Sequence, residues 1–144
     1  MTADTLAQDV AFFSIGTNDL VQYTLAVDRG NAGLAARFTP LHPAVLRFIQ
    51  RTREAGEAHG IEVGVCGEMA SEPLMAFALI GLGIRNLSVA PRSVPRVKQI
   101  VRGIHTSVAA KAAAAALLAG TASGAEAIFR AHLAAELGPE SVGA

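Results

Sequence analysis

Three short runs of hydrophobic residues, separated by longer amphipathic segments, set the framework of the predicted fold. The runs are Phe12–Ile15, Glu62–Cys66 and Asn86–Val89. Each contains β-branched or aromatic residues or alternates apolar with polar positions, and each leads into a loop rather than a tight hairpin turn. This pattern predicts three buried strands of a parallel sheet.

Helical periodicity appears between and after these runs. In Pro43–His59, apolar side chains such as Val45 and Ile49 fall on one side and arginines on the other. Proline suits the first turn of a helix, and Gly60 suits the position just past its end. The same reasoning predicts helices over Ser71–Ile80, Ser93–Arg102, about Ser107–Leu118 and about Gly124–Leu137, followed by frayed residues Gly138–Ala144.

The alternation of strands and helices predicts an α/β fold built from βαβ units. One connection is unusual, because about twenty residues from Val21 to His42 are predicted as a loop after the first strand. Loops of this length in compact domains are usually functional. In α/β folds function gathers at the carboxyl ends of strands, which places Gly16–Arg29, Cys66–Ala70 and Ala90–Arg92 on one rim.

Composition adds limits to this outline. The chain has 144 residues, which fits one domain, and its 51% hydrophobic content is enough to bury a core. Twelve basic residues balance twelve acidic ones. With no bulk positive field, we expect neither a nucleic-acid partner nor attraction to an anionic membrane. Any anion site must be local.

The single cysteine, Cys66, cannot form an internal disulfide, so we expect a reducing cytoplasm. The first residues lack the basic and apolar regions of a signal peptide. Apolar stretches are interrupted well short of the roughly 18 residues that span a bilayer. No two histidines have metal-ligand spacing, so a zinc site is not expected. His42 is expected to pack or cap at a helix start.

The segment Ser14–Asp19 is the first candidate for chemistry. Gly16 permits close backbone approach, so the amides of Gly16, Thr17 and Asn18 are placed to cradle a phosphate. The Asp19 carboxylate suits a magnesium ion shared with a phosphate. From the residues alone, the alternative is that Asn18 and Asp19 cap a turn or a helix.

Cys66 is the second candidate. A thiol at the carboxyl end of a strand, followed by Gly67 and Glu68, is suited to donate a proton or act as a nucleophile. The alternative is a buried cysteine that serves as a small hydrophobic residue. Two arginines, Arg92 and Arg96, flank a helix start, where they either bind an anion or form a solvated face.

Two longer segments carry a family resemblance. Residues 12–31, FFSIGTNDLVQYTLAVDRGN, and residues 64–69, GVCGEM, resemble the active-site segments of phosphoenolpyruvate-utilising enzymes. That family includes enzyme I of the bacterial sugar phosphotransferase system, pyruvate phosphate dikinase and phosphoenolpyruvate synthase. Residues 41–47 and 91–98 resemble enzyme I most. The resemblance covers about residues 6–103.

The resemblance implies the C-terminal part of a (β/α)8 barrel, with an Ala-rich helical tail over residues 105–138, that binds phosphoenolpyruvate and Mg²⁺ at its rim. Asp19 matches a magnesium ligand, and Cys66 matches the general acid that protonates the enolate as pyruvate forms. Residues expected at the substrate are Gly16, Thr17, Asn18, Arg29 and Glu68, with Glu68 in a supporting role.

A barrel needs eight strands, and three are predicted here. A second metal ligand, further arginines and the phosphohistidine domain that meets the phosphocarrier protein are all expected outside these residues. We therefore expect that the chain alone does not turn over phosphoenolpyruvate. We also expect its open sheet edges to favour a homo-oligomer. The alternatives are a non-catalytic phosphate-binding module and an assembly element for another chain.

Overall fold

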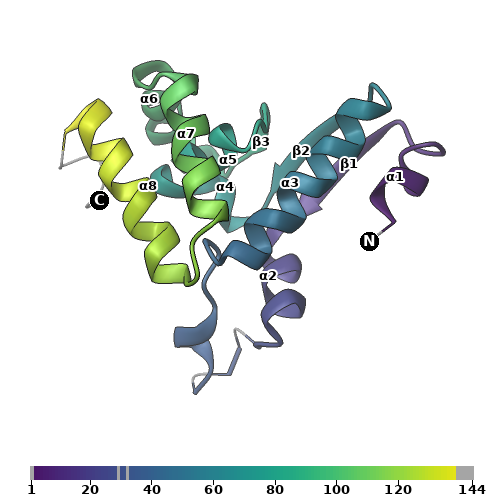
Figure 1. Ribbon diagram of the computed structural model, residues 1–144, viewed down its shortest axis with the longest axis horizontal. Helices are drawn as coiled ribbons and strands as arrows, with labels where there is room; N and C mark the ends of the chain where they lie inside the picture. Colours follow the sequence, from purple (N-terminus) through teal and green to yellow (C-terminus); the bar gives the residue numbers. More distant parts are fainter. Residues whose placement is uncertain (1, 29, 32, 139–144) are drawn as a thin grey trace.

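A three-stranded parallel sheet forms the centre of the computed structural model, which describes residues 2–28, 30–31 and 33–138. The strands are β1 (Phe12–Gly16), β2 (Glu62–Cys66) and β3 (Asn86–Ser88), in the order β1-β2-β3. The predicted α/β class and its three parallel strands are confirmed. The sheet is open at both edges, as expected for part of a barrel (Figure 1).

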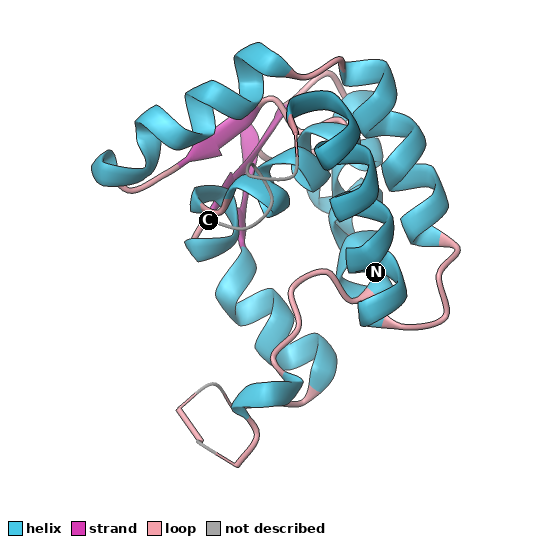
Figure 2. Ribbon diagram, turned by 90° about the vertical axis from the view of Figure 1, so that its left-hand side faces the viewer, coloured by secondary structure: helices cyan, strands magenta, loops and turns pink. Residues whose placement is uncertain are grey.

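Helices surround this sheet unevenly (Figure 2). They are α1 (Ala3–Leu6), α2 (Thr17–Leu25), α3 (Pro43–Ala58), α4 (Glu68–Ser71), α5 (Pro73–Gly81), α6 (Val94–Gly103), α7 (Thr106–Leu117) and α8 (Ala122–Leu137), with 3-10 turns η1 (Ala35–Arg37) and η2 (Pro91–Ser93). Among the described helices, none is long and apolar enough to cross a bilayer.

Two predicted boundaries are wrong for physical reasons. The connection predicted as a loop from residue 21 to 42 contains most of α2 and all of η1, because Val21 is buried in the core and the helix begins directly after β1. The helix predicted over Ser71–Ile80 is divided at Glu72. That residue is extended, as favoured before a proline, so α5 starts afresh at Pro73.

The two faces of the sheet have different surroundings. Ile15, Val63 and Val65 are buried toward the helices. Val63 lies against Gly56 of α3, and a Cβ atom on Gly56 would fall 2.3 Å from the Val63 side chain. Alternate residues point to the other face, which is partly or fully exposed. That open face carries Phe12, Ser14, Glu62, Gly64, Cys66, Asn86 and Ser88.

The main apolar core lies between α5, α7 and α8. Phe77 of α5 and Phe129 of α8 are fully buried and meet edge to face, with ring centroids 6.3 Å apart. A Cβ atom on Gly81 would lie 2.3 Å from the carbonyl oxygen of Ala109, so α5 and α7 approach almost backbone to backbone. The alanines of α7 therefore act as packing surface.

The ends of two helices are fixed by side chains. His42 is the N-cap of α3, and its Nδ1 accepts a hydrogen bond of 3.1 Å from the Ala44 amide, which confirms the predicted cap. Arg47 of α3 donates two hydrogen bonds, of 2.8 and 3.2 Å, to the Leu117 carbonyl at the end of α7. These contacts join α3, which covers the sheet, to the helical region formed by α5, α7 and α8.

Candidate functional site

The carboxyl ends of β1 and β2 meet at the predicted rim. Gly16 lies opposite Cys66 in the parallel register. Thr17, whose side chain is 1% exposed, donates a hydrogen bond of 3.1 Å from Oγ1 to the Cys66 carbonyl. This bond fixes the first residue of α2 to the last residue of β2, so the two sequence segments singled out above form one structural unit.

Gly67 makes this close approach possible. Its φ of +112° is a conformation that side-chain-bearing residues rarely adopt. A Cβ atom there would lie 2.7 Å from Thr17 Oγ1 and 3.5 Å from Asn18 Oδ1. The missing side chain therefore leaves room for the polar atoms of Thr17 and Asn18 beside the end of β2.

The amides that were expected to form a phosphate-binding loop belong instead to the start of a helix. Gly16 is the N-cap of α2, and neither Asn18 nor Asp19 is the capping residue. The first amides of a helix have no partner within it and carry the positive end of its dipole. Of the three amides predicted to cradle a phosphate, those of Thr17 and Asn18 thus lie in the first turn of a helix and that of Gly16 belongs to its N-cap residue.

A hollow of about 570 Å³ opens beside this helix start. Asn18, Glu68 and Arg92 line it from α2, α4 and η2. Its other lining residues are Thr17, Val21, Phe38, Pro40, Met69, Ser71, Glu72, Met75, Ala90 and Ser93. The hollow combines a neutral amide, two carboxylates and a guanidinium, so it offers both hydrogen-bond donors and acceptors to a small polar ligand.

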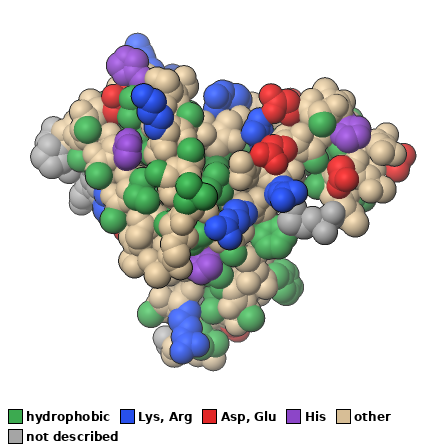
Figure 3. Space-filling model, in the orientation of Figure 1, with side chains coloured by type: hydrophobic (Ala, Val, Ile, Leu, Met, Phe, Trp, Pro, Cys, Tyr) green, Lys and Arg blue, Asp and Glu red, His purple; other side chains and the backbone are tan. Residues whose placement is uncertain are grey.

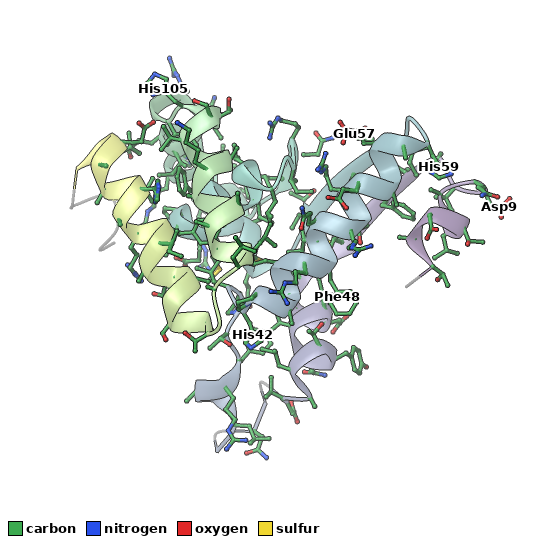
Figure 4. All side chains as sticks on the ribbon, in the orientation of Figure 1. Asp9, His42, Phe48, Glu57, His59 and His105 are labelled. Carbon is green, nitrogen blue, oxygen red and sulfur yellow. The ribbon has the colours of Figure 1, made fainter. Side chains whose placement is uncertain are left out.

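Asp19 lies on the other side of α2. It is exposed and lines a separate hollow of about 470 Å³, together with Gly16, Tyr23 and Phe48. Figure 4 shows Phe48 on the part of α3 that lies beside α2. Successive helical residues point about 100° apart, so a helix that begins at Thr17 separates Asp19 from Asn18 and Glu68.

Cys66 lies on the open face of the sheet and lines neither hollow. It is partly exposed, so it is not the fully buried apolar cysteine considered as the alternative. Its Sγ lies 3.6 Å from Ser14 Oγ and 3.5 Å from the carbonyl oxygen of Ile15. The thiol is thus held by β1 while remaining open to a ligand above the sheet.

The remaining predicted residues add less. Arg29 lies outside the described residues. In the part of the chain that the structure describes, no three His, Cys, Asp or Glu side chains gather closely enough to hold a metal ion. Asp19 provides one exposed carboxylate for a hard cation. Charged side chains of both signs are interspersed over α3 on the face drawn in Figure 3.

Sequence reasoning gave two residues of the site less weight than they merit. Arg92 was left between an anion site and a solvated face, and the structure places it in the lining of the same hollow as Asn18. Ser14 was not assigned a role, although it precedes Gly16 by two positions and so shares its face of β1. The strand register places Ser14 next to Cys66, because Gly16 pairs with Cys66 and Ser14 lies two residues before Gly16 on the same face.

Comparison with known proteins finds a match that covers all three strands. Residues 1–106 match the family described as "PEP-utilising enzyme, PEP-binding domain". The matched segment ends at the start of α7, so it contains every element of the rim.

Three relatives illustrate the match. The chain is 49% identical over 120 residues, or 83% of its length, to a multiphosphoryl transfer protein of Xanthomonas campestris, of which it covers 14%. It is 54% identical over 95 residues, or 65% of its length, to a phosphoenolpyruvate-protein phosphotransferase of Cupriavidus necator, covering 16%. It is 45% identical over 105 residues, or 73% of its length, to a Haemophilus influenzae protein of the same name, covering 18%. The chain thus spans less than a fifth of each of these relatives.

Proposed function

The chain belongs to the phosphoenolpyruvate-utilising enzymes, within their PEP-binding domain, and from that premise we propose that it forms part of a site that binds phosphoenolpyruvate and transfers its phosphoryl group. The observation that carries the proposal is the convergence of Thr17 and Asn18 with Gly67 at the ends of two neighbouring strands. In the proposed complete reaction, phosphate passes to an enzyme histidine and then to a phosphocarrier protein, which makes the parent protein a phosphotransferase.

The phosphate end of the substrate is proposed to bind at the start of α2. The unpaired amides there and the Asn18 side chain provide donors toward phosphate oxygens. Arg92, across the hollow, provides a positive charge that offsets Glu68 and Glu72. Arg29 is proposed as a second cation on the phosphoryl group, as the family resemblance implies. Positive groups at this position stabilise the charge on the transferring phosphoryl oxygens.

Mg²⁺ is the cofactor proposed for this site. Magnesium is commonly held by one or two carboxylates together with substrate phosphates, and the exposed carboxylate of Asp19 fits the role of one such ligand. When bound, the ion supplies positive charge to the phosphate oxygens. The described residues contain no complete cation site, so the proposal requires further ligands from the substrate or from other residues of the parent protein.

Cys66 is proposed as the proton donor once the phosphoryl group has left. Its partly exposed thiol faces the open side of the sheet, outside the hollow that Glu68 lines, so the proposal requires the enolate end of the substrate to extend from that hollow over the end of β2. Glu68, two residues later, lines the substrate hollow and is proposed to orient the substrate. These assignments give the two strand ends separate tasks, since β1 leads to the phosphate-binding groups and β2 to the acid.

The proposed assembly follows from the open sheet. Both β1 and β3 have an unpaired edge in the described structure, and such edges favour pairing with another chain. We propose a homo-oligomer located in the cytoplasm, with residues 1–144 forming one partial barrel domain. The open face argues less for this than the edges do, because most of its residues are small or polar. Light scattering at micromolar concentration tests the proposal, and a stable monomer contradicts it.

Calorimetric titration with phosphoenolpyruvate, with and without Mg²⁺, tests the proposed site. We expect measurable binding by the 144-residue chain, loss of most of it in Asn18→Ala, and no loss in Asn86→Ala. Asn86 is the matched control, because it is an exposed asparagine at the amino end of β3, away from the rim. Sustained pyruvate release is not expected from this chain alone.

Two outcomes would contradict the proposal. Equal binding of phosphoenolpyruvate by the Asn18 and Asn86 variants would show that the rim is not part of the binding site. Binding of inorganic phosphate as tight as that of phosphoenolpyruvate would favour a non-catalytic phosphate-binding module, since a site built for the reaction must also recognise the enolpyruvate part.

A further inference from the structure

The register of the sheet brings the Ser14 hydroxyl to the Cys66 thiol. Ser14 lies opposite Gly64, and Gly16 lies opposite Cys66, so the two side chains are diagonal neighbours on the same open face. Gly64 has no side chain, which leaves the space between them clear. The Ser14 hydroxyl donates to Cys66 Sγ across 3.6 Å, an ordinary length for a hydrogen bond to sulfur.

The thiol is held from a second direction as well. Cys66 Sγ lies 3.5 Å from the Ile15 carbonyl, to which its own proton is directed. The Thr17 hydroxyl donates to the Cys66 carbonyl at 3.1 Å and so fixes the backbone of the same residue. β1 therefore holds the sulfur and its proton, and the first residue of α2 holds the main chain, although Cys66 belongs to β2.

We propose that Ser14 is a positioning residue for Cys66: its hydroxyl holds the sulfur on the open face and stabilises the thiolate that remains after proton transfer. This inference rests on the proposed function, in which Cys66 is the acid. The S–H bond breaks and its electron pair stays on sulfur. The proton joins the methylene carbon of the enolate, whose double-bond electrons form the new C–H bond of pyruvate. Solvent then returns a proton to the thiolate.

The physical basis is the change in acceptor strength. A neutral thiol is a weak acceptor, whereas a thiolate is an ion, and hydrogen bonds to ions are markedly stronger. A fixed donor therefore favours the product side of the proton transfer. Among the charged groups, Glu62 lies at the opposite end of β2 on the same open face, Glu68 follows Cys66 by two residues, and Asp19 lies on α2; β1 and β3 contribute no charged side chain.

The pH profile of Cys66 alkylation by iodoacetamide tests the proposal directly. Cys66 is the single cysteine of the chain, so the reaction reports on it alone. Only the thiolate reacts. In Ser14→Ala we expect the rate at pH 7 to fall roughly three- to tenfold, which is the net contribution of a typical hydrogen bond. The limiting rate at high pH should stay unchanged, because access to the sulfur is the same.

Two variants separate this role from a merely structural one. Ser14→Thr keeps the hydroxyl and should restore the wild-type profile. Ser88→Ala is the matched control, because Ser88 is the register partner of Cys66 on β3 and shares the open face, yet its hydroxyl makes no described hydrogen bond to the thiol. An unchanged profile in Ser14→Ala, or an equal shift in Ser88→Ala, overturns the proposal.

Protection by phosphoenolpyruvate keeps the inference distinct from the proposed function. We expect saturating phosphoenolpyruvate with Mg²⁺ to slow alkylation of both wild type and Ser14→Ala, since Ser14 acts on the sulfur rather than on the substrate. A substrate that binds without protecting Cys66 contradicts the proposed function, by separating the acid from the substrate. Even then, the pH profile of alkylation without substrate still tests the contact between Ser14 and the thiol.

Discussion

Two glycines show how differently the helical region and the rim use a missing side chain. Gly81 lies where α5 meets α7, and its absent Cβ lets the helix backbone approach the carbonyl of Ala109. Gly67 lies where β2 ends, and its absent Cβ leaves room for the polar atoms of Thr17 and Asn18. The first closes an apolar contact, and the second keeps a polar cavity open.

This contrast extends to the surroundings of each glycine. The helical region buries nearly all of α5 and whole faces of α7 and α8. The rim contains one fully buried polar residue, Thr17, among partly exposed neighbours. We therefore expect substitutions in the helical region to change stability without changing ligand binding.

The largest effect should come from the aromatic pair of the helical region. Phe129→Ala removes a fully buried ring that packs edge to face on Phe77, and such truncations cost about 3–5 kcal/mol of unfolding free energy. Denaturant titration measures this loss. Leu118→Ala is the control, since Leu118 is 84% exposed and should change stability by less than about 0.5 kcal/mol. Similar losses in both variants would refute the assigned core.

Filling the helix contact should have the next largest effect. In Gly81→Ala the new Cβ would fall 2.3 Å from the Ala109 carbonyl, so α5 and α7 must separate, at a cost of about 1–3 kcal/mol. Gly120→Ala is the matched control, because nothing lies within 4 Å of its Cβ position. Equal melting temperatures for the two variants would show that the helices are not in contact.

Substitution of the rim glycine should affect binding more than stability. Gly67→Ala introduces strain at φ +112° and a Cβ atom 2.7 Å from Thr17 Oγ1, and we expect a loss of about 1–2 kcal/mol in stability. Gly60→Ala adds strain at φ +68° with nothing nearby. Both should lower the melting temperature, but only Gly67→Ala should weaken phosphoenolpyruvate binding in the calorimeter. Weakened binding in both would indicate a general loss of structure.

The smallest effect should be a pH-dependent one in the helical region. Glu136 accepts hydrogen bonds from the His105 amide at 2.6 Å and from its ring at 2.9 Å. These bonds lower the pKa of Glu136 below its ordinary value of 4.5. Because the folded-state pKa is the lower one, the carboxylate stabilises the fold above about pH 4.5 and loses this effect as pH falls through the folded value.

Melting curves of wild type and Glu136→Gln from pH 7 to pH 3 measure this contribution. Wild type should be the more stable at pH 7, and the difference should shrink as the carboxylate is protonated. His105 lies at the start of α7, far along the helical region from His42 (Figure 4), so ligand binding at the rim should be the same in both proteins at pH 7. A constant difference across the range would contradict the titration.

The strands and most helices could be predicted because their patterns are local. β2 has the predicted bounds, and β1 extends one residue further, to Gly16. α2 could not be predicted, since only Val21 and its partly buried neighbours mark its apolar face, and the Gly16–Asp19 segment was interpreted as a loop. Its burial depends on α3, which lies far along the sequence.

The site could be predicted only in part for the same reason. Parallel strands bring the ends of β1 and β2 together, so the proximity of Thr17 to Cys66 followed from the order of elements. The separation of Asp19 from Asn18 did not, because it depends on the residue at which α2 begins. The contact of Ser14 with the thiol required the register, which a single sequence does not specify.

The strand order also has a consequence for biosynthesis. Each strand pairs with the one that precedes or follows it along the chain, β1 with β2 and then β2 with β3. The sheet can therefore assemble in the direction in which a ribosome delivers it, with no early strand waiting for a distant partner. Once residue 88 has left the exit tunnel, the described sheet has all of its strands. The contact of α5 with α7 then forms over a sheet that already exists, and the packing of Phe129 of α8 on Phe77 follows it.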